Sequence, residues 1–294
     1  MVDTLKKHSN NIRKNIIKMV TEAKSGHPGG SLSSVEILTA IYFTQMDITK
    51  ENLESVDRDR FVLSKGHASP VLYATLAEKG FLKEEELSTF RKINSRLQGH
   101  PSMRKLAGVD MSTGSLGQGI SAAVGMALSD KYHEKHHRIY TLLGGGECQE
   151  GQVWEAAMAA AHYKLDNILA FVDANGLQID GKVSDVMNPS PIDEKFQAFG
   201  WHVIVLADGN DIQAVVEACE QAKQVKGKPS VIVAKTVKGK GVSFMENQAA
   251  WHGNAPSEEQ CKEALVEVEG GLKYGKGSNE RSIWKRISKA STRK

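Results

Sequence analysis

The sequence has few of the features that mark specialised classes of protein. Its three cysteines, Cys148, Cys219 and Cys261, are odd in number and never spaced as Cys-x-x-Cys, which excludes a disulfide framework and a cysteine-based zinc site. It contains no run of 18 apolar residues, and its first 15 residues have no apolar signal-peptide core. A net charge of +3 on 294 residues is small for a nucleic-acid-binding surface. We therefore expect a cytoplasmic protein that binds neither membranes nor nucleic acids.

What the chain does contain is a regular alternation of apolar runs and helical patterns. This alternation is typical of α/β proteins with a mostly parallel, doubly wound sheet flanked by helices. The predicted strands are 60–64, 138–143, 167–173, 202–206 and 229–235, and the predicted helices are 4–23, 35–45, one from residue 70, 117–132, 151–163, 191–199 and 211–225. We predict one domain over residues 1–275 and a basic, polar tail over residues 276–294. In such sheets, ligands bind at the carboxyl ends of the strands.

A glycine-rich turn follows one of these strands. In the stretch TLLGGGECQEG, residues 141–151, Gly144, Gly145 and Gly146 separate a strand from a helix, and backbone N–H groups of such a turn suit an anion. Many α/β turns are glycine-rich for steric reasons only. The loop FVDANGLQIDG, residues 171–181, follows the next strand, and adjacent parallel strands would bring both loops together. Its amide and carbonyl oxygens are the hard ligands that Mg²⁺ or Ca²⁺ prefers.

Taken with other segments, these loops resemble the transketolase family. The turn and the loop after it are similar to that family's thiamine diphosphate motif, which starts Gly-Asp-Gly and ends near Asn-Gly. Other segments resemble the family in the same order: SGHPGGSLS, DRFVLSKGHASPVLYA, QGHPSM, AGVDMSTGSLGQGISAAVGMA, KTVKGKG and WHGNAP. The resemblance covers about residues 10–258. It implies a thiamine-diphosphate-binding fold, specifically its diphosphate-binding domain.

The resemblance also implies which residues hold the cofactor. His67 would contact the diphosphate, and the segment of Gly114, Ser115 and Leu116 would lie against the two rings of thiamine. Gly146 and Asn175 would contact the diphosphate as well. Asn175 and the carbonyl of Leu177 would bind Mg²⁺, or Ca²⁺ in its place.

Three further histidines, His27, His100 and His252, resemble those that surround the donor sugar's C1 and C2 oxygens, and His252 would also touch the cofactor. Imidazoles titrate near neutral pH and can donate or accept protons there. A single histidine is more often a half-buried ring with its hydrogen bonds made and no role in function. We interpret the remaining six histidines in this way: His8, His133, His136, His137, His162 and His202. Glu150 resembles a glutamate at the interface between subunits. Glu150 and Glu155 can also be explained as acidic residues near the start of a helix, where negative charge interacts favourably with the helix dipole.

The chain differs from an undivided transketolase in length. A full transketolase continues with a pyrimidine-binding domain, which carries the glutamate that activates the cofactor, and a C-terminal domain. A chain of 294 residues resembles instead the N-terminal subunit of a split enzyme. We expect a natural subunit rather than a truncated chain. We also expect it to self-associate and to bind a separate C-terminal subunit, giving a heterotetramer, because the helices 117–132 and 151–163 are unusually apolar.

The second difference concerns the metal. The family's metal-binding aspartate aligns with Gly145, which has no side-chain oxygen. Glu147, two residues later, is a conceivable replacement, although the family keeps a glutamate there beside the aspartate. The sequence does not say whether metal binding survives this loss.

Three functions remain open. The first is transfer of a two-carbon ketol unit between sugar phosphates, as in the pentose phosphate pathway. The second is a related reaction with another acceptor, such as a dihydroxyacetone or sulfo-sugar enzyme. The third is a non-catalytic paralogue, which Gly145 favours and the retained histidines disfavour.

Overall fold

The computed structural model describes residues 1–273, so the predicted tail 276–294 lies outside the described residues. The central element is a five-stranded sheet in which every neighbouring pair is parallel. Its order is β1-β2-β3-β7-β6, and a two-stranded antiparallel ladder, β4-β5, lies apart from it. The strands are β1 (Arg60–Leu63), β2 (Ile139–Gly144), β3 (Ile168–Asp173), β4 (Leu177–Gln178), β5 (Gly181–Lys182), β6 (His202–Leu206) and β7 (Ser230–Ala234).

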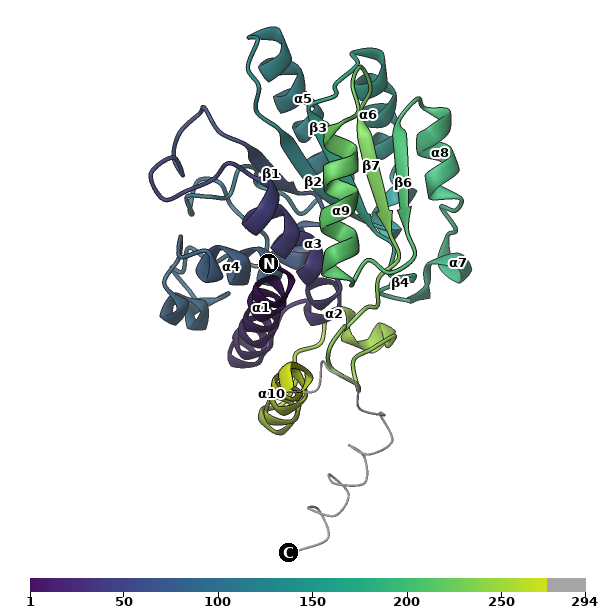
Figure 1. The fold of residues 1–294 in the computed structure, drawn as a ribbon. Helices are drawn as coiled ribbons and strands as arrows, with labels where there is room; N and C mark the ends of the chain where they lie inside the picture. The colour runs from purple at the N-terminus through teal and green to yellow at the C-terminus, as the bar shows by residue number, and fades with distance from the viewer. Residues whose placement is uncertain (274–294) are drawn as a thin grey trace, which may run out of the picture.

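Helices cover both faces of the sheet (Figure 1). On one face lie α1, α3, α4 and α9, and on the other lie α5, α6 and α8. The helices are α1 (Val2–Ala23), α2 (Pro28–Leu32), α3 (Val35–Ala40), α4 (Ser69–Glu78), α5 (Gln118–Tyr132), α6 (Gly151–His162), α7 (Val183–Val186), α8 (Ile192–Ala198), α9 (Ile212–Lys223) and α10 (Glu258–Lys273). A π-helical turn, η1 (Ile41–Gln45), continues α3, and short 3₁₀ turns are η2 (Gly66–Ala68), η3 (Glu84–Thr89), η4 (Gly146–Gln149) and η5 (Ala249–His252).

The three inner strands, β2, β3 and β7, are buried and mostly apolar along nearly their whole length, because helices cover both of their faces. In β3, Leu169 and Phe171 point into the core under α1, α3 and α9. Their neighbours Ala170 and Val172 point into the opposite core, under α5, α6 and α8. Polar and apolar residues therefore do not alternate along a strand that is covered on both faces. This explains why the sequence shows continuous apolar runs at these strands.

The order of the strands places a crevice between β3 and β7. The chain passes from β1 to β2 to β3, then crosses to the edge strand β6 and returns to β7, next to β3. At the carboxyl ends, Gly144 pairs with Asp173, and Asp173 pairs with Ala234. The loops after β1, β2, β3 and β7 therefore leave the sheet side by side. Ligands of open α/β sheets bind at such a point.

The structure confirms the predicted fold class. Each predicted strand and helix is present, with its ends shifted by at most two residues, and helix 35–45 consists of α3 and η1. The prediction missed α2, the β4-β5 ladder, α7 and α10, the last of which packs beside α1. None of the described helices has the length and apolarity that a bilayer span requires.

Candidate active site

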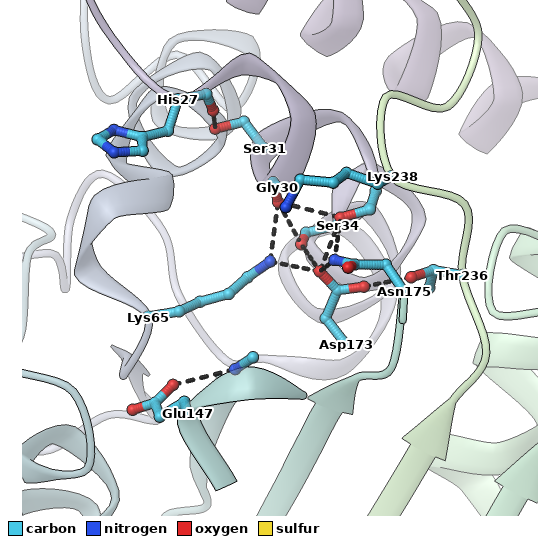
Figure 2. Close-up of polar contacts among 12 residues, drawn as sticks. His27, Gly30, Ser31, Ser34, Lys65, Glu147, Asp173, Asn175, Thr236 and Lys238 are labelled. Carbon is cyan, nitrogen blue, oxygen red and sulfur yellow. Dashed lines mark hydrogen bonds and ion pairs between the residues drawn. The ribbon is translucent and has the colours of Figure 1, made fainter. Parts of the chain in front are cut away.

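The carboxylate of Asp173, at the end of β3, is the centre of the crevice. Lys65 Nζ donates to its Oδ2 at 2.6 Å, Ser33 Oγ at 2.7 Å and Asn175 Nδ2 at 2.9 Å. Thr236 Oγ1 donates to its Oδ1, and Figure 2 shows Lys65, Asn175 and Thr236 converging on Asp173. Burial alone would raise the pKa of Asp173, but Lys65 and the hydroxyl donors hold that pKa below its usual range. Asp173 is therefore a buried anion that ties the ends of β1, β3 and β7 together.

Two lysines give this crevice a positive charge. The side chains of Lys65 and Lys238 are almost fully buried. Lys65 also donates to the carbonyl of Gly30 at 2.8 Å, and Lys238 donates to the carbonyl of Leu177 at 3.3 Å. Burial, together with the charge of Lys65, lowers the pKa of Lys238 to about 8, so Lys238 is still mostly charged at neutral pH. Two ammonium groups facing one carboxylate leave a net positive charge, which suits an anionic ligand.

Three of the predicted histidines form one cluster beside the lysines. The ring centroids of His27, His67 and His252 are 5.2 to 5.3 Å apart in all three pairs. Lys238 Nζ lies 3.0 Å from Nδ1 of His252, and the buried Nδ1 of His27 has no hydrogen-bond partner among the described residues. An unpaired buried nitrogen of this kind fits a site that is completed by a ligand.

The histidine cluster is uncharged at neutral pH. Burial, followed by nearby positive charges, lowers the pKa of His27 to about 4 and that of His252 to about 3. Burial and the charge of Lys65 also lower the pKa of His67 well below its ordinary value. Neutral imidazoles both donate and accept hydrogen bonds, whereas imidazolium only donates.

His100 lies outside this cluster, at the rim. It is exposed, and its ring packs against Gly114, where an added Cβ would lie 3.0 Å from His100 Cδ2. The loop of Gly114 lies close to the loop after β1: a Cβ on Gly66 would lie only 2.6 Å from the backbone of Thr113. Glycine at position 66 is therefore required by the close approach of the two loops.

Comparison with known proteins identifies this arrangement. The family model for the thiamine diphosphate-binding domain of transketolase matches residues 4–271. The 6-deoxy-6-sulfo-D-fructose transketolase subunit SqwG of Clostridium sp. (strain MSTE9) is 47% identical over 265 residues, which are 90% of this chain and 96% of that subunit. The chain belongs to the transketolase family.

Longer transketolases show the same relationship over part of their length. Human transketolase is 42% identical over 275 residues, which span 91% of this chain but 42% of the human protein. The structure of Campylobacter jejuni transketolase superimposes with a TM-score of 0.87 at 36% identity, covering 92% of this chain and 43% of that one. The predicted transketolase family, its fold and its thiamine diphosphate-binding domain are thus confirmed.

The residues predicted for the metal site lie in neighbouring loops. Gly145 and Asn175 leave neighbouring strands, and the N–H of Gly145 donates to the carbonyl of Asp173 at 3.0 Å. Asn175 Oδ1 accepts a hydrogen bond from the N–H of Leu177 at 3.1 Å. The carbonyl of Leu177 faces Lys238, as described above. Among residues 1–273, no group of three or more His, Cys, Asp or Glu side chains is arranged to hold a metal ion.

The contacts of Glu147 argue against it as a replacement for an aspartate at position 145. Its carboxylate is buried and accepts hydrogen bonds from Ser64 Oγ, from the N–H of Gly117 at 2.9 Å and from the N–H of Gly144 at 3.0 Å. Figure 2 shows it well apart from Asp173. Burial raises the pKa of Glu147, while these donors oppose the rise. Glu147 therefore fixes the turn and the start of α5.

Sequence reasoning did not identify Asp173, Lys65 or Lys238. Each lies in one of the segments that resemble the family, but only the fold shows that residues 65, 173 and 238 meet. One signal was present: the charged Asp173 ends the apolar run of β3, and the charged Lys65 follows the end of β1 by two residues. The other predicted residues lie in loops and element starts: Ser115 and Leu116 follow Gly114 before α5, Gly146 begins η4, and the exposed Glu150 precedes α6.

Proposed function

We propose that this chain is the N-terminal subunit of a two-chain transketolase. With thiamine diphosphate and Mg²⁺, it would transfer a two-carbon ketol unit from a ketose phosphate to an aldose phosphate. The observation that carries the proposal is the cluster of His27, His67 and His252 beside the buried lysines, at the crevice where this fold binds ligands.

The proposed partner is a C-terminal subunit that carries the pyrimidine-binding domain. Two relatives support it, because they are named as subunits and match this chain over nearly their whole length. One is the Clostridium protein described above, and the other is one chain of the apulose-4-phosphate transketolase of Phocaeicola vulgatus, 41% identical, of which this chain covers 94%. We further propose that the two kinds of chain form a heterotetramer in the cytoplasm and act in the pentose phosphate pathway.

The residues of this chain would bind and orient the reactants. Lys65, Lys238 and His67 suit the diphosphate, because they surround the crevice with positive charge and N–H donors. Gly114, Ser115, Leu116 and Gly146 would line the rest of the cofactor. Bound thiamine diphosphate supplies the electron sink that allows the ketose C2–C3 bond to break. His27, His100 and His252 would exchange protons with the sugar's oxygens: a neutral ring would accept a proton, and the imidazolium formed in this way would return it.

The donors for Mg²⁺ are incomplete. We propose Asn175 Oδ1 and the Leu177 carbonyl as its protein ligands, and both are neutral oxygens. Mg²⁺ keeps water readily, so water would fill the position that an aspartate at 145 would occupy. The two oxygens now accept hydrogen bonds from the Leu177 N–H and from Lys238, which the ion would have to displace or share. The metal site therefore fits Mg²⁺ weakly.

A second candidate is a ketol transferase acting on a sulfo-sugar. It is favoured by the 47% identity to a protein named for 6-deoxy-6-sulfo-D-fructose. A non-catalytic role is disfavoured, because such a protein has no need for several neutral, ligand-facing histidines.

The test is an assay of the chain with thiamine diphosphate, Mg²⁺, xylulose 5-phosphate and ribose 5-phosphate, alone and with the C-terminal chain of a transketolase. In a parallel assay, 6-deoxy-6-sulfo-D-fructose replaces the donor. We expect turnover only when both chains are present. Substantial turnover by the single chain would refute the split-enzyme proposal, and none with either donor would favour the non-catalytic alternative.

A further inference from the structure

Arg91 is a cation at the rim of the candidate active site that the proposed reaction does not use. Its backbone has a φ of 59°, a left-handed conformation that is uncommon for a residue with a side chain. The N–H of Arg91 donates to the carbonyl of Leu97 at 2.9 Å, which closes a loop over residues 91–97. Residues in such conformations persist where the surrounding structure holds them, and they gather at functional sites.

The guanidinium of Arg91 contacts two loops that each lead to a predicted histidine. Its Nη1 donates to Ser25 Oγ at 2.6 Å, two residues before His27. It also lies under Gly99, one residue before His100, where an added Cβ would be 2.9 Å from Nε and 3.1 Å from Cζ. Arg91 is therefore the link between segments that lie 75 positions apart in the sequence (Ser25 to His100).

The same guanidinium has no acidic partner. Its side chain makes one hydrogen bond among the described residues, to Ser25, and it lies over the ring of Phe90 at 5.5 Å. No carboxylate of residues 1–273 lies within ion-pair distance of it, whereas the nearby Arg96 is paired with Glu86 at 2.8 Å. The guanidinium has five N–H groups, so most of them remain available.

The charged groups around the two histidines are few. His27 is surrounded by His67 and His252 in ring contact and by the charges of Arg91, His100 and Lys238. His100 has Arg91 as its one resolved charged neighbour. For both rings, burial, which is only partial for the exposed His100, lowers the pKa most and Arg91 is the next cause.

We propose that Arg91 is a positioning residue, which ties the loop of His27 to the loop of His100 and places one positive charge beside both rings. The link sets how far apart the two imidazoles lie at the mouth of the site. The charge adds to the effect of burial in lowering the pKa of both imidazoles, and an unprotonated ring can accept a proton while its N–H donates a hydrogen bond. The role given to these histidines rests on the proposed function, whereas the link itself does not.

The first test follows the histidines of the chain by NMR, without a partner or cofactor. In Arg91→Met, which keeps the length of the side chain and removes its charge, the pKa of His100 and of His27 should rise by about 0.5. His8 and His202 should not change. Arg91→Lys should keep most of the effect of the charge. Arg96→Met is the matched control, because it removes an arginine of the same segment whose guanidinium is already paired, and it should change neither pKa.

The second test measures turnover in the two-chain enzyme. Arg91→Met and Ser25→Ala should lower kcat by about tenfold or more with little change in KM, because the histidines are misplaced. Arg91→Lys should keep the pKa values of the two histidines close to those of the wild type. It should keep only part of kcat, because one ammonium group cannot contact both loops as the planar guanidinium does.

The outcomes separate this proposal from the proposed function. Unchanged His100 and His27 titration in Arg91→Met overturns the proposal, whatever the activity. If Arg91→Met does not fold, Ser25→Ala decides: unchanged His27 signals and an unchanged kcat overturn it. If the wild-type pair of chains transfers no ketol unit, the proposed function fails, while the titration still tests the role of Arg91.

Discussion

At the scale of single residues, Gly145 stands where the resemblance to the family predicts a metal-binding aspartate. Its backbone is right-handed helical, with φ −59° and ψ −42°, so a residue with a side chain can adopt it. A Cβ there would make ordinary contacts, 3.5 Å from the carbonyl of Asp173 and 3.6 Å from Ala174. Gly145 also lines an open pocket of about 400 Å³. Neither the backbone conformation at position 145 nor a lack of room for a side chain therefore explains why a carboxylate is missing there.

We expect Gly145→Asp to strengthen cofactor binding. The aspartate would supply the one protein anion for Mg²⁺, and removing one partner of a buried charged pair costs about 3 kcal/mol at the lower end, or about a hundredfold in affinity. The measurement is calorimetric titration of thiamine diphosphate at saturating Mg²⁺ in the two-chain complex. Gly145→Asn is the control, with the same size and no charge. Affinities that agree within about threefold would show that the carboxylate is not needed.

His67 and His252 should differ in the step that they affect. His67 is proposed to contact the diphosphate before reaction, so His67→Ala should weaken cofactor binding by about ten- to 150-fold, the loss of one charge-assisted hydrogen bond. His27→Ala and His252→Ala should mainly lower kcat, because the sugar's oxygens change charge during reaction. Steady-state kinetics at varied cofactor concentration distinguish the two. Equal effects on KM alone in all three variants would contradict these roles.

The sequence predicted the site only in part at this scale. Histidines in glycine-flanked loops were identified through the family resemblance, and three of them do meet in one cluster. The buried network of Asp173 was not predicted, because Lys65 reaches it from 108 positions away. A pairing at that separation depends on strand order, which no local pattern contains.

At the scale of elements, the start of α5 is packed tightly against the end of β1. A Cβ on Gly119 would lie 2.5 Å from Ser64 Cα, and Ser64 in turn donates to the buried Glu147. By contrast, Gly125, in the same helix, has nothing within 4 Å of the position of a Cβ. The two glycines therefore make a matched pair.

Gly119→Ala should destabilise the chain by about 1–3 kcal/mol, because overpacking forces α5 away from Ser64. Gly125→Ala should stabilise it by up to about 1 kcal/mol, because alanine favours a helix. Chemical denaturation followed by circular dichroism measures both. If Gly119→Ala proved as stable as Gly125→Ala, the contact with Ser64 would not constrain the helix.

The elements themselves were largely predictable. Strands buried on two faces give apolar runs, and helices such as α1 and α9 give clear apolar stripes. The short helix α2 and the ladder β4-β5 escaped prediction, because five and two residues per element are too few to show a period. The helix α10 has a weaker pattern, mostly polar in composition.

At the scale of the whole molecule, α5 and α6 are only half covered. In α5 the buried residues are Gly119, Ile120, Ala123, Val124 and Ala127. The outward side of α6 carries Met158, which is 57% exposed. The inner faces of both helices thus pack in the hydrophobic core, and their outer faces remain exposed and free to contact another chain.

We expect the chain to self-associate and to form a larger complex with a C-terminal partner. Sedimentation velocity on the chain, in the absence and presence of that partner, measures this. Met158→Glu should weaken assembly, since it places a charge on the proposed contact. Val266→Glu, at an exposed position of α10, is the control. A monomer under both conditions would contradict the prediction.

The histidine cluster also makes the free energy of unfolding depend on acidity. Unfolded histidines titrate near pH 6.5, whereas folded His27 and His252 titrate near 4 and 3, and His67 well below 6.5. Between about pH 6.5 and pH 4 the unfolded chain therefore binds up to three more protons than the folded one. Unfolding consumes protons in this window, so stability is highest above it and falls as the solution is acidified. Denaturant midpoints measured from pH 7 to pH 5 should decrease steadily, and replacement of His252 by glutamine should flatten that decrease.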